Sequence, residues 1–154
     1  MKNSLFHLLH LTDPTLPIGG YSHSAGLETY VQNGKVKDPE TAKIFITEML
    51  NRNIQYTDAA FVSLAYDAAS DKDLIKLATL DQECNAVKLP MEMRQASLKL
   101  GMRLLKIFQP LLQMELADQY RKMILEKSAD GHYCIVFGLM ASLLNISKED
   151  ALEG

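Results

Sequence analysis

Apolar residues recur at three- and four-residue steps along most of this chain, and this spacing restricts its fold more than any other feature. Between 90 and 108 the apolar positions are Met93, Ala96, Leu100, Leu104, Ile107 and Phe108. Charged and polar residues occupy the opposite face, as in a helix that packs one side against a core. Convincing runs of alternating strand residues do not occur in the sequence. The sequence therefore predicts an all-α fold.

Start signals mark several of the expected helices. Asp38 followed by Pro39 is typical of a helix N-terminus, because aspartate caps free N–H groups and proline has none to satisfy. One apolar stripe follows, at Ala42, Phe45, Ile46, Met49 and Leu50. A second helix is expected from about 57 to 69. Ser70 with Asp73 three residues later resembles a capping box, and the inward positions of the helix after it are Leu74, Leu77, Ala78 and Leu80.

The last third of the chain contains its most apolar segment. Residues 132–144 are apolar almost all round, so we expect this helix at the centre of a bundle. The helix before it is expected at 111–127. Together with helices at 4–11 and from near Ser24, these segments predict a single bundle of about seven helices.

The chain ends on a helix start. Ser147-Lys148-Glu149-Asp150 has the residues of a helix N-terminus, yet only seven residues follow Ser147. So short a helix is marginal, because nucleation costs more than its few hydrogen bonds return. We therefore expect residues 1–154 to be one helical domain, a fragment of a longer chain that lacks its C-terminal helices. One face of the 132–144 helix would then lack its natural cover.

Composition and charge exclude several classes of protein. The 154 residues carry 16 Lys and Arg against 19 Asp and Glu, a net charge of −3, so a basic surface for nucleic acid is not expected. The longest apolar run, 134–144, is shorter than the ~20 residues needed to cross a bilayer. The two cysteines have no CxxC spacing and fit neither a disulfide scaffold nor a zinc knuckle. We expect a cytoplasmic protein without nucleic-acid or membrane partners.

The segment 13–23, Asp-Pro-Thr-Leu-Pro-Ile-Gly-Gly-Tyr-Ser-His, departs from the helical pattern. Its two prolines restrict the backbone and its two adjacent glycines permit conformations closed to other residues, so we expect a shaped loop. Binding and catalytic residues concentrate in such loops. The segment lacks the GxxxxGK[ST] and GxGxxG patterns, and no Lys or Arg lies between Lys2 and Lys35. A nucleotide site is therefore disfavoured.

Two further interpretations of this loop stay open on residue chemistry alone. Ser22, His23 and Glu28 supply the residue types of a hydrolase, although neighbours in sequence seldom meet in triad geometry and a GxSxG elbow is missing. Alternatively, Tyr21 packs and His23 hydrogen-bonds a helix end, which would hold the loop in place.

Candidate metal ligands occur only in pairs. His7 and His10 lie one helical turn apart, and His132 with Cys134 forms an H-x-C pair. Both pairs suit a soft or borderline cation, but neither has enough further ligands nearby. We expect His7 and His10 on the edge of a helix and Cys134 in the core. The sequence predicts no bound metal and no cofactor.

Three blocks of sequence, in one order across nearly the whole chain, carry a family resemblance. The first is 16–28, Leu-Pro-Ile-Gly-Gly-Tyr-Ser-His-Ser-Ala-Gly-Leu-Glu. The second is 90–97, Pro-Met-Glu-Met-Arg-Gln-Ala-Ser, followed by Gly101, and the third joins His132 to Val-Phe-Gly at 136–138. Together they resemble the signatures of the urease accessory protein F (UreF) family.

The resemblance implies an all-α protein without catalytic activity of its own. Members of that family form homodimers and bind the accessory protein called UreD or UreH. Through that complex they recruit the UreG GTPase to apo-urease, where GTP hydrolysis is coupled to nickel insertion, and they regulate that GTPase. Family members continue beyond this length with helices that contribute to dimerisation and partner binding. We therefore expect residues 1–154 to lack part of those interfaces.

The first block is where we expect partner binding. Pro17, Gly19 and Gly20 would shape the loop, and Tyr21 would be a rigid aromatic anchor of the kind that dominates interfaces. His23 and Glu28 would then supply polar contacts or hold the loop in place.

The second and third blocks are expected to support the structure. Glu92 and Arg94 would pair with groups of the loop, where a partly buried charge left unpaired is costly. His132 would have a structural role in the third block. Two other functions stay as alternatives: a helical hydrolase that uses the Ser22, His23 and Glu28 side chains, and a helical interaction module unrelated to urease.

Overall fold

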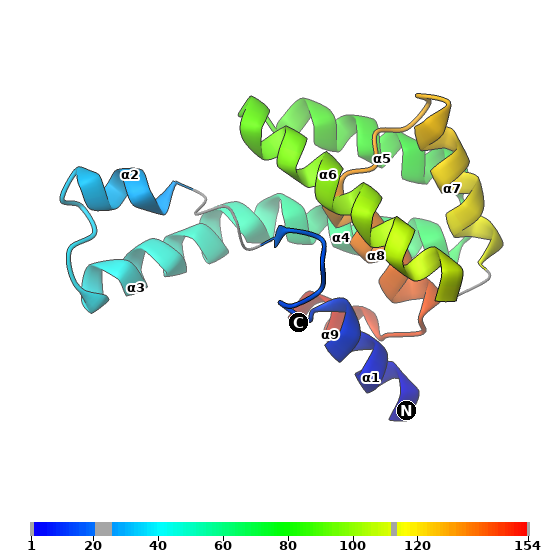
Figure 1. The fold of residues 1–154 in the computed structure, drawn as a ribbon, viewed down its shortest axis with the longest axis horizontal. Helices are drawn as coiled ribbons and strands as arrows, with labels where there is room; N and C mark the ends of the chain where they lie inside the picture. Colours follow the sequence, from blue (N-terminus) through cyan, green and yellow to red (C-terminus); the bar gives the residue numbers. More distant parts are fainter. Residues whose placement is uncertain (1, 21–25, 112–113, 154) are drawn as a thin grey trace.

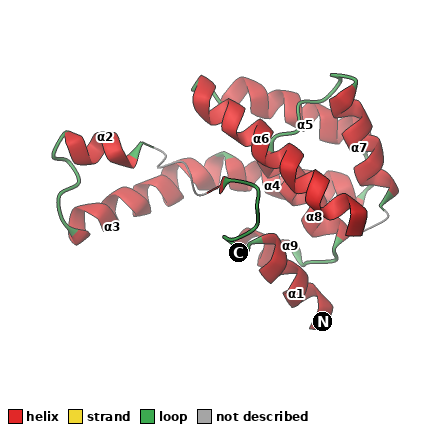
Figure 2. Ribbon diagram, viewed as in Figure 1, coloured by secondary structure: helices red, strands yellow, loops and turns green. Residues whose placement is uncertain are grey.

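Helices are the only regular secondary structure in the described part of the chain. The computed structural model describes residues 2–20, 26–111 and 114–153, and all regular structure within them is helix (Figure 2). In chain order the α-helices are α1 (Lys2–Leu11), α2 (Leu27–Gln32), α3 (Pro39–Glu48), α4 (Asp58–Ser70), α5 (Leu74–Val87), α6 (Met91–Phe108), α7 (Glu115–Leu125), α8 (Tyr133–Leu143) and α9 (Lys148–Glu153). The all-α prediction is confirmed. Short segments such as 148–153 form helices of their own, so the described helices outnumber the expected seven.

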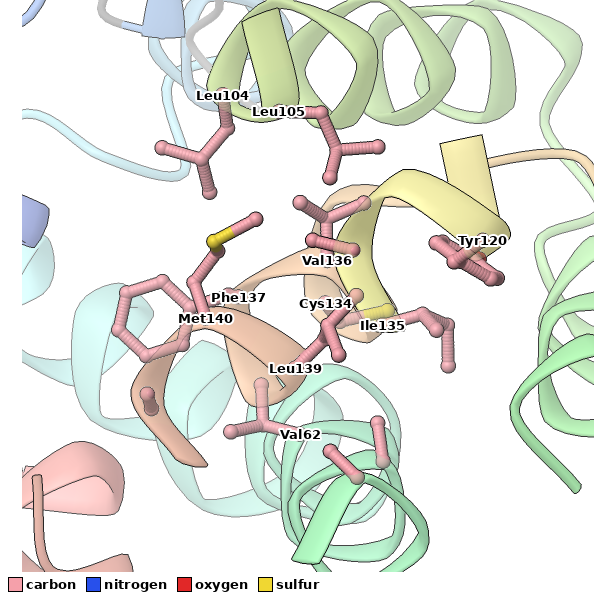
Figure 3. Packing of buried hydrophobic residues seen from close by; sticks show 14 of the residues in the cluster. Val62, Leu104, Leu105, Tyr120, Cys134, Ile135, Val136, Phe137, Leu139 and Met140 are labelled. Carbon is pink, nitrogen blue, oxygen red and sulfur yellow. The ribbon is translucent and has the colours of Figure 1, made fainter. Parts of the chain in front are cut away.

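Helix α8 is the centre of the molecule, as its sequence predicts. All eight residues from Cys134 to Ala141 are buried, and they pack mainly against α4 and α6. Figure 3 shows Val62 of α4 on one side of α8 and Leu104 and Leu105 of α6 on the other. A helix that is apolar all round needs neighbours on every side, and α8 has them.

The expectation that one face of α8 lacks cover is wrong for the described residues. Helices α1 and α9 also contact α8, and Ala151 of α9 is buried. The Ser147 start signal is confirmed, since the Ser147 hydroxyl accepts a hydrogen bond from the Asp150 N–H at 3.1 Å. Packing therefore stabilises a helix that is too short to persist by its own hydrogen bonds.

Close approach of α4 and α8 depends on Gly138. A Cβ atom at this position would lie 2.5 Å from the Val62 carbonyl oxygen and 3.0 Å from the Ala65 Cβ. The missing side chain lets the two backbones approach, and small residues of α4 such as Ala65 and Ala69 are buried on that helix. Packing at this distance leaves no room for an extra methyl group.

The predicted helix starts are correct in one case and shifted in the other. Asp38 accepts a hydrogen bond from the Thr41 N–H at 2.8 Å and completes a capping box before Pro39. Ser70 does not cap α5, because it is the last residue of α4 and its hydroxyl bonds to the Tyr66 carbonyl. Asp73 is itself the N-cap and accepts from the Lys76 N–H. An aspartate caps directly, so the serine is not needed there.

Helices α2 and α3 form an arm that extends away from the rest of the molecule (Figure 1). The chain passes from α3 through a π-helical segment, Met49–Asn53, and a 3₁₀ turn, Ile54–Tyr56, into α4. None of the residues of α2 or α3 is buried. The stripe from Ala42 to Leu50 is therefore not a core face. Helices of the described part are too short or too polar to cross a membrane.

Candidate functional site

The loop after α1 is anchored by apolar side chains. Leu16 and Ile18 are buried in the core, whereas Pro17 between them is exposed. Asp13 begins the turn by accepting hydrogen bonds from the Thr15 N–H at 2.8 Å and hydroxyl at 2.7 Å. The Thr15 hydrogen bonds hold the pKa of the Asp13 carboxyl below its usual value. The loop is thus a shaped segment, as its prolines and glycines predict.

Arg103 of α6 fastens the same loop from the other side. Its guanidinium Nη1 donates a hydrogen bond to the Ile18 carbonyl oxygen at 2.9 Å. Gly19 follows with a φ of +81°, and a Cβ there would lie 2.6 Å from Arg103 Nη1. Glycine meets both demands, because it tolerates a positive φ and leaves space for the guanidinium. The sequence places Arg103 on a polar helix face and contains no sign of this contact.

The remaining first-block residues are described only in part, because residues 21–25 lie outside the described structure. Gly20 is exposed at the end of the loop. Tyr21, Ser22 and His23 lie outside the described residues, so their predicted roles stay predictions. Glu28 lies in the first turn of α2 with its side chain exposed to solvent. An exposed carboxylate suits a surface contact better than an enclosed catalytic pocket.

The expected pairing of Glu92 and Arg94 with the loop stays a prediction, because residues 21–25 of the loop lie outside the described structure. Within the described residues, the Arg94 guanidinium donates to the Lys88 carbonyl oxygen at 3.1 Å, at the end of α5. Nine residues of helix separate Arg94 from Arg103, a rise of about 13 Å, and the described part of the loop contacts α6 at Arg103. Glu92 is exposed in the first turn of α6, where the helix dipole favours a carboxylate.

His132 joins the second and third sequence blocks. It is fully buried and precedes α8. Its Nδ1 lies 3.2 Å from the Ser97 hydroxyl and its Nε2 lies 3.3 Å from the Asn85 Oδ1. The Ser97 hydroxyl also accepts from the Tyr133 N–H at 3.1 Å. Gly101 lies one turn beyond Ser97, and a Cβ on it would lie 2.1 Å from the Gly131 carbonyl oxygen.

A buried carboxylate fixes the turn that carries His132. Asp81 of α5 is fully buried and accepts four hydrogen bonds. Three come from the N–H groups of residues 130, 131 and 132, at 2.6, 2.6 and 2.9 Å, and one from the Tyr120 hydroxyl at 2.8 Å. Burial, together with the Asp81 charge, raises the pKa of Tyr120 well above its usual value. The sequence contains no local signal for this role, because every partner is 39 or more residues away.

Exposed apolar residues are frequent in the arm and in the segment that joins it to α4. We call these residues the arm surface, defined as the exposed large apolar residues between 30 and 56, which are Tyr30, Val31, Ile44, Ile46, Leu50, Ile54 and Tyr56. The Tyr30 and Phe45 rings pack 5.0 Å apart and join α2 to α3. A cavity of about 420 Å³ lies beside them, lined partly by Val36 and Met49.

Within 2–20, 26–111 and 114–153, no three His, Cys, Asp or Glu side chains are grouped so that they could hold a metal ion. The His10 ring instead packs 4.9 Å from Phe108. Cys134 is buried in the core, as its apolar neighbours predict. The described residues of this region thus offer an anchored loop and an exposed apolar surface.

The chain is similar to proteins of one family along most of its length. The UreF family model matches residues 36–154. Urease accessory protein UreF of Actinobacillus pleuropneumoniae serotype 5b (strain L20) is 46% identical over 145 residues, which cover 94% of this chain and 64% of that protein. Urease accessory protein UreF of Haemophilus influenzae (strain PittGG) is 43% identical, over 94% of this chain and 62% of that protein. Urease accessory protein UreF of Bacillus sp. (strain TB-90) is 33% identical, over 97% of this chain and 66% of that protein. The chain therefore spans less than two thirds of the length of these relatives.

Proposed function

The chain belongs to the UreF family of urease accessory proteins, and we propose that it works in urease maturation as a protein-binding scaffold without catalytic activity. In this proposal it binds the accessory protein UreD or UreH, and the complex recruits and regulates the UreG GTPase at apo-urease. Nickel is the cargo of that process, and nickel insertion is coupled to GTP hydrolysis by UreG. The site of action would be the cytoplasm, where these partners meet.

The observation that carries the scaffold proposal is the exposure of the arm surface. None of the ten residues of helix α3 is buried. Ile44 and Ile46 of this helix, and Leu50 just after it, are apolar and at least half exposed to solvent. Several exposed apolar residues in one part of a folded protein favour an interaction site there, because leaving apolar surface in water costs free energy. An enzyme would instead need reactive side chains that converge in a concave site.

The arm surface and the loop form one continuous stretch of chain. The loop that begins at Asp13 leads through residues 21–25 into α2, and Glu28 is exposed in the first turn of α2. We assign the arm surface to the UreD or UreH partner, with the Tyr30 and Phe45 rings as rigid aromatic groups at its centre. Pro17, Gly19 and Gly20 shape the approach to this surface, and Tyr21, His23 and Glu28 supply contacts beside it.

A charge placed on the arm surface tests this assignment. We expect Leu50→Glu to lower binding to purified UreD or UreH at least tenfold, because a buried unpaired carboxylate costs more than ~1.4 kcal/mol at an interface. The matched control is Ile75→Glu, because Ile75 is 79% exposed in the first turn of α5, outside the arm. Equal binding by both variants and the unchanged chain would exclude the arm surface as the partner site.

The loop residues need a separate test in cells. Tyr21→Ala and Glu28→Ala, introduced into the full-length protein, are expected to reduce UreG recruitment and urease activation while the protein stays folded. Thermal melting verifies the fold of each variant. Normal recruitment and normal urease activity with a folded variant would remove that residue from the partner site.

A further inference from the structure

Two thiols face each other in the core, and the proposed scaffold function makes no use of them. Cys84 of α5 and Cys134 of α8 have their Sγ atoms 3.5 Å apart, and both side chains are buried. They are the two cysteines of the chain. A disulfide holds its sulfur atoms about 2.05 Å apart. A disulfide that bonds α5 to α8 would therefore need the two sulfur atoms to approach by about 1.5 Å.

The two sulfur atoms share a hydrogen bond in an environment that favours one thiolate. The hydrogen bond with Cys134 lowers the pKa of Cys84 to about 6; burial opposes this shift, and His132 and Lys88 add to it. The same hydrogen bond and burial raise the pKa of Cys134 well above its usual value. Lys88 keeps its charge because Asp58 pairs with it at 2.7 Å, despite the opposing effect of burial on the pKa of Lys88.

A surface cavity reaches one residue of this pair, Cys134. The cavity has a volume of about 300 Å³ and is lined by Cys134, Asp58, Tyr133 and Phe137 among others. Hydrogen peroxide has only two heavy atoms and fits such a space. The cavity wall is mostly apolar, and larger charged oxidants gain little from it. Cys134 thus lines a cavity at the surface although its side chain is almost fully buried, and Cys84 lies behind it, 3.5 Å from its sulfur.

We propose that Cys84 and Cys134 form a redox modification site that hydrogen peroxide closes into an intramolecular disulfide. This proposal is independent of the scaffold function. In this proposal the proton shared by the two sulfur atoms passes from Cys134 to Cys84 along their hydrogen bond, so that Cys134, the residue of the pair that lines the cavity, reacts as the thiolate. It attacks a peroxide oxygen, an S–O bond forms as the O–O bond breaks, and hydroxide leaves.

The second step consumes the other thiol. The released hydroxide takes the shared proton and becomes water, which leaves the partner sulfur as a thiolate. This thiolate attacks the sulfenic sulfur, the S–S bond forms and the S–O bond breaks, and a second hydroxide leaves to be protonated by solvent. Two electrons pass from the sulfur pair to peroxide, so two thiols and one peroxide give one disulfide and two waters.

The disulfide would join two helices that are far apart in the sequence. Cys84 and Cys134 are 50 positions apart, and a cross-link of this span restricts the unfolded chain strongly. The Cys84–Cys134 bond would fasten α5 to the central helix α8 and leave the arm untouched. Oxidation would therefore stabilise the body of the protein under peroxide stress, with the partner surface still available.

The test uses the unchanged chain. The purified protein is treated with hydrogen peroxide, denatured, alkylated with N-ethylmaleimide and weighed intact, while a non-reducing gel reports its size. We expect the untreated chain to take two alkyl groups and the treated chain none. The treated chain should be about 2 Da lighter than the reduced chain without alkyl groups, and it should form no dimer. Dithiothreitol should restore both thiols. Two alkyl groups after treatment, or a cross-link only between chains, would overturn the proposal.

Two further measurements distinguish this cysteine pair from thiols with an ordinary pKa that form no disulfide. The rate of disulfide formation should rise through about pH 6 and level off near pH 7, whereas an unperturbed thiol, with a pKa of about 8.5, would still gain rate above pH 8. The oxidised chain should melt about 5 to 10 °C higher. Cys134→Ala, with one thiol, should show neither the mass change nor the higher melting temperature. A rate that still rises above pH 8, or an unchanged melting temperature, would count against the proposal.

Discussion

Helices α8 and α3 are similar in length and opposite in environment. Eight residues of α8 are buried on all sides, from Cys134 to Ala141, and none of α3 is. Burial of apolar surface is the main stabilising contribution to a fold, so α8 holds the body together, whereas the apolar residues of α3 add little to it. We interpret the body, α4 to α8, as the stable part of the molecule and the arm as the part that recognises a partner.

The body should be sensitive to loss of its buried carboxylate. Asp81→Ala removes the acceptor for three backbone N–H groups and the Tyr120 hydroxyl. We expect it to lower the free energy of unfolding by about 3 to 5 kcal/mol, because several buried donors lose their partner at once. Urea denaturation measures the change. Glu83→Ala is the matched control, since Glu83 lies on the same helix with its side chain exposed; equal losses for the two variants would contradict the role of Asp81.

The α4–α8 contact should tolerate no added methyl group. Gly138→Ala places a Cβ 2.5 Å from the Val62 carbonyl oxygen, and we expect a loss of about 1 to 3 kcal/mol from forced separation of the helices. Gly20→Ala is a suitable control, because a Cβ there meets its nearest atoms at 3.9 Å. Thermal melting of the two variants decides the point, and a Gly138→Ala protein as stable as the unchanged chain would contradict the packing described.

The loop anchor should have a smaller effect that is confined to one region. Arg103→Ala removes the hydrogen bond to the Ile18 carbonyl, and we expect a loss of about 1 kcal/mol. Limited proteolysis should then cut near residues 13–20 faster than in the unchanged chain. Lys99→Ala, one turn earlier on the exposed face of α6, should leave the cutting rate unchanged. Equal rates for both variants would remove Arg103 from the anchor.

The arm should show the smallest change in stability. Leu50→Glu replaces a half-exposed side chain in the π-helical segment between α3 and α4, and we expect the free energy of unfolding to stay within about 0.5 kcal/mol of its original value. Chemical denaturation measures it. A loss above ~2 kcal/mol would show that Leu50 belongs to the core of the protein, and the contrast between arm and body would fail.

Periodicity predicts helices well and their environments only in part. It placed α8 at the centre because a helix that is apolar all round has one stable location. It could not tell whether the stripe from Ala42 to Leu50 faces a core or a partner, since both need the same apolar face. The roles of Asp81 and Arg103 depend on contacts across 39 or more residues. Such contacts leave no local pattern, which explains why the sequence does not predict the contact of Arg103 with the loop.

The assignment of partner recognition to the arm predicts which residues a bound partner protects from solvent. Amide hydrogen exchange of the 154-residue chain should be fast in α3 and slow in α8 when the chain is free, because unpacked helices open most readily. Added UreD or UreH protein should slow exchange across residues 27–56 and leave α8 unchanged. Protection of another surface, with the exchange of residues 27–56 unaltered by the partner, would contradict the assignment of recognition to the arm.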